Sequence, residues 1–281
     1  MAFSFDCCAA THIGNRRKNN EDNFFIGDML LPEEQTAMSQ SGNKLVVKSS
    51  SSKGAENRLF AVSDGMGGHE FGEVASYIAM CALSEFSSSG KLSRKRTDKF
   101  AYIQSFQDMI AQTNGKILEY AAENGADENM GATLSGLIAF NDEAAPFNIG
   151  DSSTLLYEGG ALRKLTIDDN EKSMRLDADA AELMSGGRLL TKYFGLPRSS
   201  GILTAAISTP VSLKPGQVFI IASDGLTDYL SIDDMTQILT EHPTDSEETV
   251  NALIDSALNA ENGGRDNITI VMISVSKASR N

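Results

Sequence analysis

The chain has 281 residues, and its 24 lysines and arginines against 38 aspartates and glutamates give a formal net charge of −14. This acidic balance disfavours a protein that clamps nucleic acid, because phosphate contacts need Lys and Arg. It also disfavours binding to anionic lipid, which repels such a surface. A hydrophobic content of 41% and a charged content of 22% are ordinary globular values and argue against wholesale disorder.

The cysteines and the N-terminal residues bear on the cellular compartment. Cys7, Cys8 and Cys81 are odd in number and form no CxxC pair, so neither a disulfide framework nor a structural zinc site is expected. The first residues lack a basic stretch and include Asp6, which is not the pattern of a signal peptide. No apolar run approaches the roughly 18 residues that a membrane span needs. We therefore expect a soluble, cytoplasmic protein.

Strand patterns and turn signals alternate along most of the chain. The first two strand patterns enclose a connection rich in Ser, Glu and Lys. We interpret its residues 33–57 as a flexible hairpin insertion, in which KLVV (44–47) could add a short strand. Gly159–Gly160 is typical of a hairpin turn. The predicted strands cover residues 24–30, 58–64, 132–140, 146–151, 153–160, 161–166, 202–209, 217–222 and 267–275.

Apolar residues at spacings of three and four predict helices. One such face runs through residues 70–86, and a stronger one runs from Ile103 to Tyr120 and ends at Asn124–Gly125. Two further helices are expected near the C-terminus, with Ser231 and Ser246 as their N-caps. Strands that pair locally, with helices in separate pairs, favour one α+β layered domain over residues 1–281 rather than a doubly wound parallel sheet.

Two apolar strands both end in the same tripeptide, Ser-Asp-Gly. The first places Asp64 at its end and the second places Asp224 there. Asp22 stands just before a third strand and Asp266 just before a fourth. An isolated Asp-Gly is usually a turn, but four acids at strand ends form a cluster of oxygen donors if those ends meet. Hard cations such as Mg²⁺ and Mn²⁺ prefer that kind of site.

Other chemistries fail against the same residues. The glycines at 65, 67, 68 and 72 miss the GxGxxG pattern because position 70 is Glu, and the chain contains no GxxxxGK[ST]. HExxH fails because position 73 is Glu, and GDSS (150–153) lacks the second glycine of a GxSxG elbow. Nucleotide-binding, zinc-hydrolase and serine-hydrolase interpretations therefore find little support.

A series of motifs resembles the metal-dependent Ser/Thr protein phosphatases, the PPM or type 2C family. The resemblance runs in order from Arg17 to the last strand, and the Met that follows DG in DGMGGH is similar to the bacterial branch. It implies a central sandwich of two antiparallel sheets flanked by helix pairs, with a flap over residues 170–203 beside the active site. The motifs are RKNNED (17–22), SDGMGGHEFGEVAS (63–76), GATLSG (131–136), NIGDSS (148–153), LTIDDN (165–170), ASDGLTD (222–228) and GGRDN (263–267).

The resemblance also implies a role for each matching residue. Two ions, Mn²⁺ or Mg²⁺, would be bridged by Asp64, and a weaker third ion would bind in addition. Arg17 would bind the substrate phosphate and not the ions, because its planar fork matches two phosphoryl oxygens. Glu21 would contact the metal ligands without binding an ion itself. The metal ligands would be Asp22, Asp64, the Gly65 carbonyl, Asp151, Asp224 and Asp266, with Asp151 and Asp224 holding the third ion.

The implied activity is hydrolysis of phosphoserine and phosphothreonine on proteins by a water shared between the two ions, which would reverse the action of a Ser/Thr kinase. Met66 stands where some relatives carry a His that protonates the leaving group, and Asp169 and Ser153 also depart from common residues of the family. A monomer acting on phosphoproteins is expected. Two alternatives stay open: a non-catalytic regulatory member of the same fold, and a phosphatase dedicated to one small regulatory protein.

Overall fold

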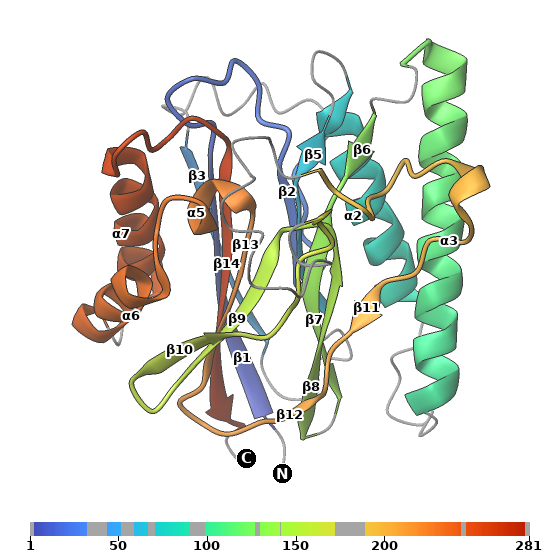
Figure 1. Ribbon diagram of the computed structural model, residues 1–281. Coiled ribbons are helices and arrows are strands. Elements are labelled where there is room, and N and C mark those ends of the chain that lie inside the picture. Colours follow the sequence, from blue (N-terminus) through green and yellow to red (C-terminus); the bar gives the residue numbers. More distant parts are fainter. Residues whose placement is uncertain are drawn as a thin grey trace.

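Two antiparallel β-sheets face each other in the centre of the molecule, and helices cover their outer faces (Figure 1). The computed structural model describes residues 3–32, 44–51, 59–66, 71–89, 99–126, 130–140, 142–171, 189–242 and 246–278. Every described strand pairing is antiparallel. The α+β sandwich expected from the sequence is confirmed.

The first sheet has six described strands. Their spatial order is β10 (Ala161–Lys164), β9 (Ser153–Glu158), β13 (Val218–Ala222), β14 (Ile268–Lys277), β1 (Phe3–His12) and β3 (Lys44–Ser51). The second sheet runs β11 (Ala206–Ile207), β8 (Glu143–Ile149), β7 (Leu134–Phe140), β4 (Leu59–Ser63) and β2 (Asn23–Ile26), with β12 (Val211–Ser212) also on β8. A small pair, β5 (Gly65–Met66) and β6 (Gly131–Ala132), lies apart from both sheets.

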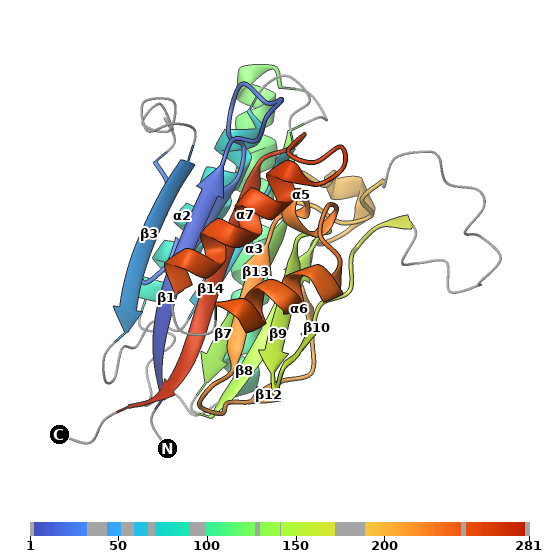
Figure 2. The same ribbon diagram turned by 90° about the vertical axis from the view of Figure 1, so that its left-hand side faces the viewer.

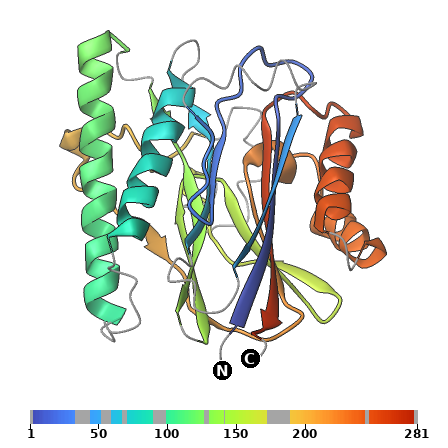
Figure 3. The same cartoon turned by 180° about the vertical axis from the view of Figure 1, so that it is seen from behind.

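Each sheet carries its own helix pair, as the side and rear views show (Figures 2 and 3). Residues of α2 (Gly72–Ser88) and α3 (Lys99–Asn124) share a buried cluster with the second sheet. Residues of α6 (Ile232–Glu241) and α7 (Ser246–Asn259) share one with the first sheet. The short helices α5 (Asp224–Thr227) and η3 (Arg198–Ser200) lie in connections. None of the described helices is long and apolar enough to cross a membrane.

β14 shows how the strand period produces these layers. Its Val271 and Ile273 belong to the core between the two sheets, whereas Ile270 and Met272 belong to the core beneath α6 and α7. Successive side chains of a strand point to opposite faces, so a strand buried on both faces reads as a continuous apolar run. The three apolar layers that result hold the strand ends in fixed positions.

The strand ends that carry the candidate ligands lie at one end of the sandwich. His12 at the end of β1 pairs with Ile268 at the start of β14, and Asn23 at the start of β2 pairs with Ser63 at the end of β4. Asp22, Asp64 and Asp266 therefore enter the same region from different strands. Figure 1 shows these connections together at its upper edge.

Several predicted strands are shorter in the structure than the sequence indicated, and two of them differ by three residues or more. The strand predicted at 24–30 ends at Ile26, because the chain turns at Gly27–Asp28, where both residues have positive φ, and Met29 folds back to hydrogen-bond with Ile26. The strand predicted at 202–209 is reduced to β11, which pairs with β8 at the edge of the second sheet. An edge position requires few backbone pairings, and an apolar pattern does not reveal that.

Other predictions concern segments that are only partly described. Within 33–57, residues 44–51 form β3, which pairs with β1 rather than with the strands that flank it in sequence. Within 170–203, residues 172–188, including a predicted short helix at 177–187, lie outside the described residues. Ser231 caps α6 with its side chain, as predicted. Ser246 is instead the first residue of α7, not its N-cap.

Candidate functional site

Five aspartates share one region, which we call the carboxylate cluster: Asp22, Asp64, Asp151, Asp224 and Asp266. Burial raises the pKa of Asp64 well above its usual value, and the charges of the other four carboxylates raise it further. Burial also raises the pKa of Asp22 to about 7. Burial, followed by the charge of Asp151, raises the pKa of Asp224 to about 8. Shifts of this kind are typical of functional sites, because only a proton or a cation offsets so many buried charges.

Asp64 is held at the end of β4 by the segment before β7. Its backbone N–H donates to Thr133 Oγ1 at 3.0 Å, and its carbonyl accepts from the Thr133 N–H at 2.8 Å. The preceding Ser63 donates its hydroxyl to the Thr133 carbonyl at 2.6 Å. The backbone around Asp64 is thus fixed on both sides by one threonine.

Asp22 is oriented by the serine of the second Ser-Asp-Gly tripeptide. Ser223 Oγ donates to Asp22 Oδ2 at 2.8 Å, and Ser223 Oγ itself accepts the N–H of Thr269 at 2.9 Å. Both Ser223 and Asp22 are fully buried. A single hydroxyl therefore links the end of β13, the start of β2 and strand β14 beside the cluster.

Two glycines allow backbone to approach the cluster closely. A Cβ on Gly65 would lie 2.1 Å from the Gly72 carbonyl oxygen and 2.6 Å from that of Glu21, and the Gly65 N–H donates to Glu21 at 3.1 Å. A Cβ on Gly225 would lie 1.9 Å from the Asn267 carbonyl oxygen. The Glu21 side chain lies against Gly72, and burial raises the pKa of its carboxyl. The Asp-Gly pairs of the sequence are therefore sites of close packing.

Arg17 lies at the cluster and pairs with one of its members. Its Nη2 atom is 2.6 Å from Asp266 Oδ2, and both side chains remain partly exposed. Asp266 also accepts the N–H of Asn267 through Oδ1 at 2.8 Å. Arg17 thus contacts a predicted metal ligand directly, and its predicted role of binding the phosphate rather than the ions stays a prediction.

All predicted ligand atoms are oxygens, five carboxylates and one backbone carbonyl, and this donor set suits Mg²⁺ or Mn²⁺. Within the described ranges, no three His, Cys, Asp or Glu side chains are arranged to hold a metal ion as they stand. Two of the carboxylates face other partners, because Asp266 pairs with Arg17 and Asp22 accepts from Ser223. Asp224 Oδ1 is buried without a hydrogen-bond partner. The donor chemistry fits a cation, provided that these side chains rotate to meet it.

Several supporting residues were missed by the sequence analysis. Thr133 positions Asp64, Ser223 positions Asp22, and Asn267 accepts the N–H of Glu21 while donating to the carbonyls of Ile13 and Asn19. The repeated Ser-Asp-Gly pattern contained a usable signal, because Ser223 donates to Asp22 and Ser63 donates to the Thr133 carbonyl beside Asp64. Thr133 lies in the GATLSG motif (131–136), but that motif by itself does not indicate a contact with Asp64.

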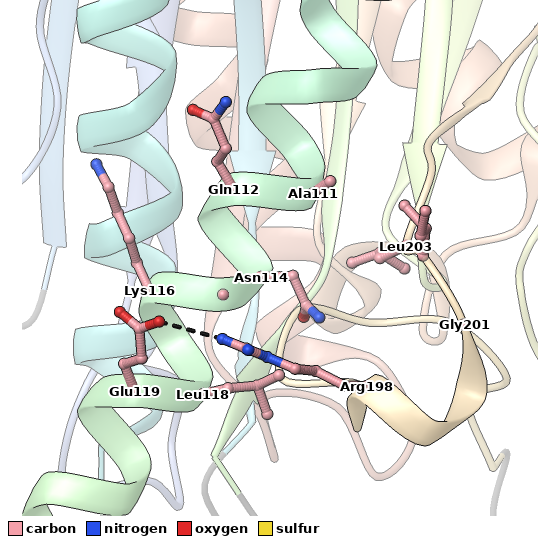
Figure 4. A pocket seen from close by; sticks show the side chains of 11 residues that line it. Ala111, Gln112, Asn114, Lys116, Leu118, Glu119, Arg198, Gly201 and Leu203 are labelled. Atoms are coloured by element: carbon pink, nitrogen blue, oxygen red, sulfur yellow. Dashed lines mark hydrogen bonds and ion pairs between the residues drawn. The ribbon is translucent and has the colours of Figure 1, made fainter.

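A pocket of about 700 Å³ lies between α3 and residues 198–203, and none of the predicted site residues lines it (Figure 4). Arg198 reaches across from this segment to α3, with its Nη2 atom 3.1 Å from Glu119 Oε1. Asn114, which also lines the pocket, binds the backbone of residues 195 and 196. The pocket is therefore separate from the carboxylate cluster.

Comparison with known proteins identifies the family. The model of the protein phosphatase 2C family matches residues 48–260. The chain is 28% identical over 227 residues to the serine/threonine protein phosphatase PstP of Mycobacterium tuberculosis, which covers 78% of this chain but only 40% of PstP. It is also 28% identical over 222 residues to the serine/threonine phosphatase stp of Listeria innocua, covering 76% of this chain and 83% of that one.

A solved structure has the same fold. The catalytic domain of serine threonine protein phosphatase PstP in complex with two manganese ions superposes with a TM-score of 0.73 at 24% identity, covering 98% of this chain and all of that domain. At this identity the likeness concerns the fold. Because the family model spans most of the chain, the chain belongs to the protein phosphatase 2C family.

Proposed function

We propose that this protein hydrolyses phosphoserine and phosphothreonine on other proteins and depends on Mn²⁺ or Mg²⁺. The carboxylate cluster beside Arg17 carries the proposal. Five carboxylates form an oxygen-rich site in which burial raises the pKa values of Asp22, Asp64 and Asp224, and the Arg17 guanidinium supplies the fork that matches a phosphoryl group. Family membership and two relatives named as serine/threonine phosphatases support the same activity.

Each residue would have a distinct task in this reaction. The five aspartates and the Gly65 carbonyl would hold two cations, with a weaker third at Asp151 and Asp224. Such cations activate water as a nucleophile and offset charge on the phosphoryl oxygens. Arg17 would orient the phosphoryl group by hydrogen bonds to two of its oxygens. Met66 has no proton to donate to the leaving oxygen.

The finer features of the proposal concern where and on what the protein acts. We propose phosphoproteins as substrates, so that the protein opposes a Ser/Thr kinase, and we propose that it works as a monomer in the cytoplasm. The acidic net charge supports a protein rather than a nucleic-acid partner.

Hydrolysis of one phosphothreonine peptide, with added Mn²⁺ and with excess EDTA, tests the activity. Phosphate release should require Mn²⁺ and should return when Mn²⁺ is added back after chelation. The Asp64→Asn variant, purified in the same way, controls for contaminating phosphatases and should release phosphate more than about 100-fold more slowly. A wild type that binds the phosphopeptide without hydrolysing it in Mn²⁺ would instead indicate a regulatory member of the fold.

A further inference from the structure

Asp169 lies beside residues 189–191, so the chain before and the chain after residues 172–188 run next to each other here. Its N–H donates to the Gly150 carbonyl at 2.8 Å, and its own carbonyl accepts the Thr191 N–H at 2.8 Å. The neighbouring residues pair as well, since the Glu171 N–H donates to the Leu189 carbonyl at 3.1 Å. Asp169 therefore ties the base of this segment to the turn at Gly150.

The two carboxylate oxygens of Asp169 have different partners. Oδ2 accepts the backbone N–H of Gly150 at 3.3 Å, and Oδ1 lies 3.3 Å from Lys192 Nζ. The Asp169 side chain is 14% exposed and that of Lys192 is 41% exposed, so the pair is partly shielded from water. An ionised carboxylate accepts both contacts at once, whereas an amide in its place offers only one acceptor oxygen.

The turn that Asp169 holds leads directly into the carboxylate cluster. Gly150 has φ of +94°, and a Cβ there would lie 2.7 Å from Thr133 Cγ2. On the other side of Asp151, Ser152 Oγ lies 2.6 Å from Thr133 Oγ1, which also accepts the Asp64 N–H. Asp151 thus sits in a turn fixed between Asp169 and Thr133.

We propose that Asp169 and Lys192 are positioning residues that hold the Gly150–Asp151 turn and so set the affinity of the cation bound through Asp151. The inference rests on the proposed function, because that function assigns the cation to Asp151. The charge of Asp151 acts on both Asp64 and Asp224. A shift of the turn would therefore move Asp151, the carboxylate that the loop before β9 contributes to the cluster.

Calorimetric titration with Mn²⁺ tests the pair in four variants of the full chain. Asp169→Asn and Lys192→Met should each weaken the binding of Mn²⁺ at Asp151 by about tenfold. That is the lower end of the loss of metal affinity seen when residues that support metal ligands are replaced. Lys192→Arg keeps the charge and should bind as the wild type does. Asp168→Asn is the matched control, because it removes the neighbouring ion pair with Lys164 and should change nothing.

A double-mutant comparison separates positioning from simple stabilisation of the fold. In an Asp151→Asn background, Asp169→Asn should cause no additional loss of Mn²⁺ affinity, because both changes act on the same cation. Equal Mn²⁺ binding by Asp169→Asn and Asp168→Asn would overturn the proposal. So would a lower thermal stability of Asp169→Asn and Lys192→Met with unchanged Mn²⁺ affinity.

Failure of the proposed function has a different signature. In that case the wild type releases no phosphate from the peptide in Mn²⁺. If the wild type is active while Asp169→Asn and Lys192→Met match Asp168→Asn in Mn²⁺ affinity, only the positioning role is wrong. If Asp169→Asn does not fold, Lys192→Met and Lys192→Arg decide the outcome, because Lys192 is the more exposed partner.

Discussion

The guanidinium of Arg17 and the carboxylate of Asp266 form an ion pair with 2.6 Å between Nη2 and Oδ2, although 249 positions separate them in the sequence. Both side chains are about one-third or more exposed, at 44% and 32%, so the pair itself adds little to stability. Its importance is functional. A cation at Asp266 would compete for an oxygen that Arg17 now contacts, so the proposed phosphate-binding residue lies directly beside a proposed metal ligand.

Substitution of Arg17 tests this arrangement. Arg17→Ala should lower kcat/KM at saturating Mn²⁺ by roughly tenfold to a few hundredfold, because a lost charge-assisted hydrogen bond costs about 1.5–3 kcal/mol. Arg17→Lys should recover part of the loss, since an ammonium keeps the charge but not the fork. Steady-state kinetics on one phosphopeptide measures both, with the exposed Arg16→Ala as control.

The Mn²⁺ affinity of Arg17→Ala distinguishes two roles of the side chain. Removal of Arg17 frees Asp266 Oδ2, so the affinity should not fall. A variant that binds Mn²⁺ much more weakly but reaches the wild-type rate at saturation would show that Arg17 supports the metal ligands instead of the phosphate.

Asparagine substitutions in the carboxylate cluster should separate metal binding from fold stability. Asp64→Asn should lose more than about 100-fold in kcat/KM, beyond the effect of residues that only support metal ligands. Asp224→Asn and Asp266→Asn should weaken Mn²⁺ binding, as calorimetry measures. In EDTA at pH 8, Asp64→Asn should unfold at higher urea than the wild type, because folding of the variant requires neither a buried charge nor the uptake of a proton at residue 64. Wild-type rates in all three variants would refute the assigned site.

The raised pKa values of Asp22 and Asp224 predict how the stability of the metal-free protein depends on pH. Their folded-state pKa values are about 7 and about 8, against 3.8 as the ordinary value. Between these limits the folded state binds more protons than the unfolded state, so the free energy of unfolding falls as pH rises. Urea unfolding in EDTA from pH 5 to pH 9 should show this decrease, with a shallower slope for Asp22→Asn. A stability that rises over this window would contradict the prediction.

Ser223, which the sequence did not assign, should matter for both stability and metal binding. Ser223→Ala leaves the buried N–H of Thr269 without the hydroxyl that accepts it, and it removes one of the side-chain donors to Asp22. The unsatisfied groups should cost about 1–3 kcal/mol, measured by urea unfolding. The exposed Ser88→Ala, whose hydroxyl only contacts its own helix, is the control and should stay within about 0.5 kcal/mol of the wild type.

Sequence signals that arise from burial on both faces of a strand predict structure better than signals that depend on tertiary contacts. β14 was predicted because an apolar run buried on both faces is hard to mistake, whereas β11 was overestimated because edge pairing leaves no apolar signature. The acids at strand ends form one cluster only if those ends meet, and the charges of Asp22, Asp151, Asp224 and Asp266 all act on Asp64. The contact between Arg17 and Asp266 was not predicted, because side-chain orientation depends on tertiary packing that no local pattern encodes.

Two glycines in helices should respond to alanine in opposite directions. Gly115 lies inside α3, and the nearest atom to a Cβ there is Arg198 Nη2 at 3.9 Å, an ordinary contact. Gly115→Ala should therefore stabilise the protein by about 0.5–1 kcal/mol, because glycine loses more backbone entropy in a helix. Gly225 begins the turn after Asp224, where a Cβ would lie 1.9 Å from the Asn267 carbonyl oxygen. Gly225→Ala should force the backbone of residues 225 and 267 apart and cost at least about 1–3 kcal/mol.

Urea unfolding in EDTA measures both glycine variants without the contribution of bound cations. Mn²⁺ titration adds a second readout, because the shift at residue 225 moves Asp224 and Asp266 apart whereas alanine at 115 touches neither. Gly225→Ala should therefore lose Mn²⁺ affinity and Gly115→Ala should keep it. If Gly225→Ala were as stable as the wild type, the close approach of these two backbones would not exist. If it were less stable yet bound Mn²⁺ normally, the carboxylates of Asp224 and Asp266 would not bind ions in concert.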